Sequence, residues 1–147
     1  MKTRLTVYEL PIMEIDYDHV RELIDNGLEC WPVTIGKWNF PPDSKVKYIP
    51  FFIDFGCSID AEGIVEEIIK RGLIAPGFVE ISHFIEENRK AWGMAVAEKY
   101  SIVAISKIQN SFLSVIYSKY RQLDVKQVAS DEFWNKNNYF LALRKIK

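Results

Sequence analysis

The clearest pattern of apolar and polar positions lies in the middle of the chain, between residues 48 and 90. It opens with Tyr48–Phe55, a run of aromatic and β-branched residues, and Gly56 follows it directly. Such a run is typical of a buried strand, and a glycine is a common end to one. We therefore expect a core strand here, and the elements that follow it to pack against it.

A helix is predicted directly after this strand. Four apolar residues recur at spacings that place them on one helical face: Ile64, Val65, Ile68 and Ile69. Ser58 or Asp60 is expected to cap the helix, because a side-chain oxygen accepts a bond from an orphan backbone N–H there. Gly72 supplies the left-handed residue that ends such a helix, and Pro76 prevents its continuation. A second helix is predicted from Phe78, with these inward positions: Phe78, Ile81, Phe84 and Ile85.

The N-terminal part has a weaker pattern. Residues Thr3–Ile15 alternate loosely around Pro11, which predicts a first strand broken by the proline. A short helix is expected next, capped by Asp16 or Asp18.

The C-terminal third changes to the two-residue period of strands. The expected strands are Ser101–Ser106, Phe112–Tyr117, Tyr120–Val128 and Tyr139–Ile146, with a polar turn at Asn135–Asn138. Successive strands joined by short turns predict an antiparallel meander. Together with the helices upstream, they predict an α+β fold in which two or three helices pack on an antiparallel sheet formed largely by this third.

The composition indicates a single globular domain over residues 1–147, large enough to bury about two-thirds of the surface that its unfolded chain exposes. With 48% hydrophobic and 27% charged residues, disorder is not expected over most of the chain. No apolar run approaches the roughly 20 residues that cross a bilayer, and no secretory segment opens the chain. We therefore expect a cytoplasmic protein without membrane association. No phosphate-binding loop or dinucleotide fingerprint is present, so no cofactor is expected.

The net charge of −1 conceals an asymmetry along the chain. Through Glu98 there are 10 Lys and Arg against 17 Asp and Glu, whereas from Lys99 onward there are 9 against 3. The two parts therefore carry opposite net charges of −7 and +6. In one compact domain, this division predicts a field that orients a charged partner.

Several motifs occur in a fixed order along the chain. They are Asp54-Phe55-Gly56, Ser58–Gly72, Ala75-Pro76, Phe78–Asn88, Val103-Ala104-Ile105 and the stretch from Trp134 to Lys145. In this order they resemble an uncharacterised family of small bacterial proteins, a resemblance that implies a fold rather than a reaction. The closing strand Tyr139–Arg144 is also similar to the last core strand of C-type-lectin-like and formylglycine-generating-enzyme-like domains. That similarity implies a binding scaffold, although the chain has no acidic calcium loop.

Two small sets of residues suggest chemistry. Cys57 precedes a predicted helix N-terminus, where partial positive charge stabilises a thiolate, and His83 is a candidate base for it. Glu80, His83 and Glu87 follow the spacing i, i+3 and i+7, which places a nitrogen and two carboxylates on one helical face, as a metal site requires. We favour structural interpretations: a buried cysteine and a solvated helix face. Cys30 and Cys57 are interpreted as reduced, with a single bridge between them as the alternative.

The more extensive candidate is a surface. In the C-terminal third, cations are interleaved with aromatic residues, and Arg121, Lys126 and Trp134 are its candidate binding residues. Cations and stackable rings on a sheet are typical of single-stranded nucleic-acid binders. Trp31 and Trp38 lie in the irregular stretch between Glu29 and Ser44, as loop anchors or as contact residues, and we favour the anchor.

The sequence therefore predicts a non-enzymatic domain that binds a macromolecular partner. Protein is favoured over nucleic acid, because the overall charge is near neutral. The alternatives are single-stranded nucleic-acid binding by the basic aromatic sheet and a small hydrolase that uses Cys57 with His83.

Overall fold

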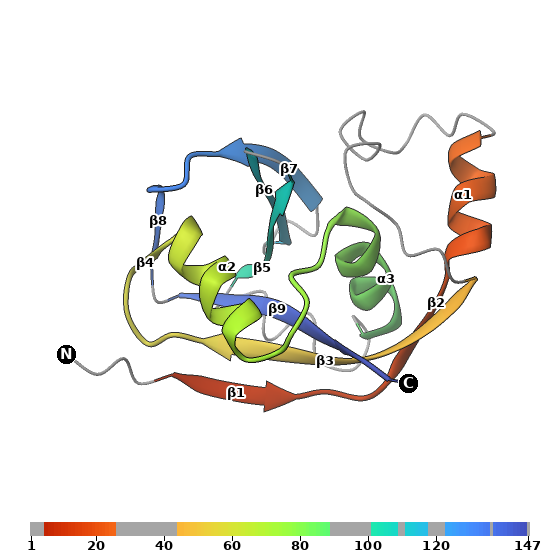
Figure 1. Ribbon diagram of the computed structural model, residues 1–147, viewed down its shortest axis with the longest axis horizontal. Coiled ribbons are helices and arrows are strands. Elements are labelled where there is room, and N and C mark those ends of the chain that lie inside the picture. The colour runs from red at the N-terminus through yellow and green to blue at the C-terminus, as the bar shows by residue number, and fades with distance from the viewer. Residues whose placement is uncertain are drawn as a thin grey trace.

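The computed structural model describes residues 5–25, 44–88, 101–108, 111–117, 123–135 and 137–146. Its strands are β1 (Thr6–Glu9), β2 (Met13–Asp16), β3 (Lys45–Asp54), β4 (Ile59–Asp60), β5 (Ser101–Ile108), β6 (Ser111–Tyr117), β7 (Leu123–Val128), β8 (Phe133–Trp134) and β9 (Asn138–Lys145). Its helices are α1 (Tyr17–Asp25), α2 (Ala61–Lys70) and α3 (Phe78–Asn88). The predicted α+β class is confirmed (Figure 1). Within these ranges, no helix combines the length and apolar character needed to cross a membrane.

The main sheet has the strand order β1-β3-β9-β5-β6-β7, and β2 also pairs with β3. The predicted meander is confirmed for β5, β6 and β7, which pair antiparallel in succession. It is wrong for the last strand, because β9 returns to lie between β3 and β5, antiparallel to β3 and parallel to β5. The segment between β7 and β9 carries β8, which pairs with β4, and brings the chain back. Local alternation predicts a strand but does not identify its neighbours.

The sheet is covered on both faces. In β3, Tyr48 and Phe52 belong to the core beneath α1 and α3, whereas Phe51 and Ile53 belong to the core beneath α2. The strand β9 alternates in the same way, with Leu141 and Leu143 on the first side and Phe140 and Ala142 on the second. Figure 1 shows α2 on one side of β5 and β6, and α1 and α3 on the other. Burial on both faces explains why β3 is apolar without alternation from Tyr48 to Ile53.

Pro50 lies inside β3, where a proline normally interrupts a sheet. Its carbonyl accepts a hydrogen bond from the Leu10 N–H at 2.9 Å. Since the N and O of one strand residue point to the same neighbour, the missing N–H of Pro50 also faces this side. Beside Pro50, β1 has already ended and β2 has not yet begun, and Pro11 lies between these two strands. The predicted strand broken by a proline is therefore confirmed, and each part pairs with its own half of β3.

Helix α2 has the predicted ends. Asp60 caps it, and at the other end Gly72 adopts a φ of 74°. The Gly72 N–H donates to the Ile69 carbonyl at 2.9 Å, and the Leu73 N–H donates to the Ile68 carbonyl at 3.1 Å. These two bonds form a Schellman motif, in which a left-handed residue satisfies the last helical carbonyls.

Beyond Gly72, the chain passes from one face of the sheet to the other. Ile74 and Leu143 exchange two backbone hydrogen bonds, of 2.7 and 3.0 Å. Ile74 thus pairs with β9 beyond the residues that pair with β5. Phe78 then starts α3 over the opposite core.

Gly72→Ala is expected to lower the free energy of unfolding by about 1 kcal/mol, because a residue with a side chain disfavours positive φ. A Cβ at this position would meet nothing within 4 Å, so the loss comes from the backbone alone. Urea denaturation measures it, and Gly72→Asn is the matched control, since asparagine tolerates this conformation better. An alanine variant as stable as the wild type would contradict the assigned helix end.

Candidate functional site

Three polar side chains meet in the core beneath α1 and α3. The Tyr17 and Tyr48 hydroxyl oxygens lie 2.8 Å apart, and the Tyr17 hydroxyl donates to Glu80 Oε2 at 3.1 Å. Glu80 Oε1 accepts from the Gly77 N–H at 2.7 Å. Both tyrosines are buried. We call Tyr17, Tyr48 and Glu80 the tyrosine–glutamate cluster.

The N-terminal ends of two helices position two members of this cluster. Tyr17 is the first residue of α1, and Asp16 caps that helix by accepting bonds from the Asp18 and His19 N–H groups at 3.1 and 3.2 Å. Of the two predicted caps, Asp16 is therefore the one used. Glu80 lies in the first turn of α3, and its bond to the preceding backbone amide is half of a capping box. The cluster thus joins α1, β3 and α3.

Burial dominates the electrostatics of the cluster. It raises the pKa of Glu80, although hydrogen bonds from the Gly77 amide and the Tyr17 hydroxyl act in the opposite direction. Burial, followed by the charge of Glu80, raises the pKa of Tyr17, which keeps its proton. The hydroxyl proton of Tyr17 is directed at Glu80, so Tyr48 donates to Tyr17. These hydrogen bonds suit the cluster to holding α1, β3 and α3 together.

The structure separates the two residues of the predicted hydrolase. Cys57 follows β3 and packs on the core beneath α2. His83 lies on α3, which covers the opposite face of the sheet. With the sheet between them, Cys57 and His83 do not form a nucleophile–base pair.

The start of α2 also offers little to a thiolate at Cys57. The Ala61 and Glu62 N–H groups donate to the carbonyls of Glu132 and Ser130, both at 3.0 Å. The next orphan donor, at Gly63, is taken by the Asp60 carboxylate. The helix N–H groups that the sequence analysis assigned to the thiolate are therefore already bonded. Cys57 is half-buried and forms no disulfide, whereas Cys30 lies outside the described residues.

The predicted metal ligands also point in different directions. The half-buried Glu80 accepts a hydrogen bond from Tyr17, whereas His83 pairs with Glu87 nearer the surface at 3.1 Å. Across the described part of the chain, no three His, Cys, Asp or Glu side chains gather as a metal site.

Most of the described aromatic residues of the predicted basic aromatic surface lie in the core. Trp134 is 9% exposed, so its assignment as a contact residue is corrected: it packs edge-on against Phe140 at 6.2 Å between ring centroids. Phe112 and Tyr117 are buried as well. Lys126 is exposed, and its Nζ lies 3.9 Å from Glu132. Arg121, Trp31 and Trp38 lie outside the described residues.

The sequence analysis missed the outer side of β1. Figure 1 shows this strand at the lower margin of the sheet, next to β3. All four of its residues are exposed, with Val7 at 38% and Tyr8 at 45%. Because the Leu10 N–H points to β3, the alternating backbone directs the N–H and C=O groups of Val7 and Glu9 away from the sheet. The sequence shows only that Thr6–Glu9 contains no cation, whereas its place at the margin follows from the strand order.

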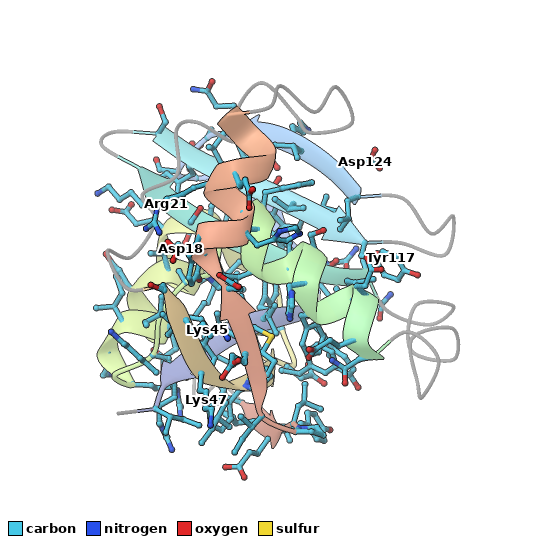
Figure 2. All side chains as sticks on the ribbon, turned by 90° about the vertical axis from the view of Figure 1, so that its right-hand side faces the viewer. Asp18, Arg21, Lys45, Lys47, Tyr117 and Asp124 are labelled. Atoms are coloured by element: carbon cyan, nitrogen blue, oxygen red, sulfur yellow. The ribbon has the colours of Figure 1, made fainter. Side chains whose placement is uncertain are left out.

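The opposite margin of the sheet differs from β1. There β7 exposes Asp124, Lys126 and Gln127. Charged side chains on an outer strand oppose pairing with another chain. Figure 2 shows Asp124 on β7 and further labelled charged side chains on α1 and β3, namely Asp18, Arg21, Lys45 and Lys47. The β1 margin carries a single charged residue, Glu9, beside the exposed Val7 and Tyr8, and is therefore less protected.

Comparison with known proteins adds no relative: no protein-family model, no curated protein and no solved structure matches the chain.

Replacing Glu80 tests the electrostatics of the cluster. Because the folded-state pKa is raised, the free energy of unfolding is highest where Glu80 is protonated in both states, and it falls as pH rises from about 4.3 through the folded pKa. Glu80→Gln stays neutral, keeps an acceptor for the Gly77 amide, and is expected to remove this fall. Urea unfolding from about pH 4 to about pH 7 measures both proteins. Parallel pH curves would contradict the assignment.

Two neighbouring aromatic residues on β8 test the burial of Trp134. Trp134→Ala is expected to lower the free energy of unfolding by about 3 kcal/mol, because it empties part of the core. Phe133 is 69% exposed, so Phe133→Ala is expected to change it by less than about 0.5 kcal/mol. The reverse order in urea denaturation would show that Trp134 is a surface residue.

Proposed function

We propose that this protein is a binding module that recognises an extended segment of a protein partner. The segment adds as a new strand to the outer side of β1. The observation that carries the proposal is the geometry of that strand: the backbone groups of Val7 and Glu9 point away from the sheet, beside the exposed side chains of Val7 and Tyr8. Strand addition uses such backbone groups for affinity and the flanking side chains for selectivity.

The contrast between the two sheet margins supports β1 as the docking site. Edge strands in natural proteins are normally protected by charge, as β7 is by Asp124 and Lys126. The exposure of Val7 and Tyr8 at this edge is explained if a partner covers them. Pro11 limits the docking length, because it falls on the outward side of the alternation and has no N–H to donate.

The competing functions lose their main supports. A hydrolase requires Cys57 near His83, and the sheet lies between them. A nucleic-acid surface requires several exposed rings beside Lys126. Phe133 is 69% exposed, but Trp134, Phe112 and Tyr117 are buried.

Val7→Pro is expected to weaken partner binding while preserving the fold. The Val7 N–H points outward, so proline removes a docking donor without removing a β1–β3 hydrogen bond. Random-sequence displayed peptides are selected on the wild type, and their affinities for both proteins are then measured by fluorescence anisotropy. We expect the affinity to fall by at least about tenfold, as for the loss of a docking hydrogen bond with its desolvated partner.

Ile69→Ser is the matched control for surface hydrophobicity. Ile69 is 63% exposed on α2, so the variant removes a more exposed apolar side chain than Val7 without touching β1. It is expected to bind the selected peptides as the wild type does. Selected peptides that bind Val7→Pro and the wild type equally would overturn the proposal, provided that both proteins unfold at similar urea concentrations.

A further inference from the structure

The side chains along β1 also specify what the partner strand carries. This inference rests on the proposed function, because it assumes docking at β1. In antiparallel pairing, the partner residues opposite Glu9, Tyr8 and Val7 follow one another in that order from the partner's N-terminus. Each therefore meets a defined β1 neighbour on a defined face of the sheet.

The position opposite Glu9 favours a cation. Glu9 is exposed, and no ion pair involves it among the described residues. A cation lies on the same face, because the Arg144 guanidinium is placed over the ring of Phe51, the register partner of Glu9, at 5.0 Å, but it forms no ion pair with Glu9. An incoming Lys or Arg therefore meets an acidic position on the outer strand, and opposite charges in direct register stabilise a strand pair.

The next two positions favour aromatic and β-branched residues. Tyr8 lies on the other face of the sheet, with its ring centroid 5.9 Å from that of Tyr139. A ring opposite Tyr8 extends this aromatic row outward, and aromatic cross-strand pairs are among the favourable ones. Opposite Val7, a β-branched residue matches the exposed aliphatic side chain.

A second copy of this chain fits the edge less well. The outward residues of two β1 strands pair around a two-fold axis in three registers: Val7 opposite Val7, Val7 opposite Glu9, or Glu9 opposite Glu9. The first two give each Glu9 carboxylate an aliphatic neighbour, Leu5 or Val7, and the third places like charges together. A partner with a cation at this position avoids all three.

We infer that the partner segment carries, from its N-terminus, a Lys or Arg, an aromatic residue and a β-branched aliphatic residue, docked antiparallel to β1. The probe is acetyl-Thr-Arg-Tyr-Val-Thr-amide, and its charge-reversed form has Glu in place of Arg. Titrations followed by the amide NMR shifts of Val7 and Glu9 give the dissociation constants. The wild type is expected to prefer the Arg peptide by roughly two- to fivefold.

Glu9→Lys is the decisive variant, because it is expected to reverse this preference in favour of the Glu peptide. If Glu9→Lys leaves the preference unchanged while Val7→Pro still weakens binding, the residue assignment is wrong and docking at β1 stands. If Val7→Pro binds both peptides as the wild type does, docking at β1 itself is wrong.

A peptide of reversed order that binds more tightly than the Arg peptide would overturn the antiparallel orientation. Amide shifts that change with neither peptide would overturn the inference. Analytical ultracentrifugation of the free protein tests whether a second copy docks at β1. A dimer that the Val7→Pro substitution dissociates would also overturn the inference.

Discussion

The antiparallel pair of β3 and β9 is the contact on which the rest of the structure depends. Their side chains alternate between two cores, so Phe52 and Leu141 support α1 and α3 while Phe51 and Ala142 support α2. Burial on both faces stabilises the pair, because apolar area is removed from water on each side. It also requires the chain to reach both faces, and every other element is arranged around that requirement.

Two local devices meet this requirement. After α2, the left-handed Gly72 turns the chain, and Ile74 replaces a strand neighbour of Leu143, so the backbone crosses the sheet level without losing hydrogen bonds. On the far side, Glu80 bonds Tyr17 and joins α3 to α1. A carboxylate enclosed in this way raises the electrostatic cost of folding, which its hydrogen bonds partly offset. The cluster therefore contributes to the architecture by joining α1, β3 and α3.

Features that depend on residues close together in the sequence could be predicted. The Asp60 cap, the Gly72 helix end and the strand broken at Pro11 depend on local geometry. The position of β9 could not be predicted, because any strand with two apolar faces fits several neighbours. For the same reason, Trp134 and Phe133 are indistinguishable by composition, although one is in the core and the other on the surface. The exposed margin at Val7 follows from strand order, which no local pattern encodes.

We propose that the outer backbone of β1 is a docking edge. Amide hydrogen exchange, measured with and without a selected peptide, tests it most directly. Without peptide, Val7 and Glu9 are expected to exchange quickly, whereas Tyr8 and Leu10 are protected by β3. With peptide, Val7 and Glu9 are expected to become protected as well. A bound peptide that leaves both exchanging quickly would contradict docking at this edge.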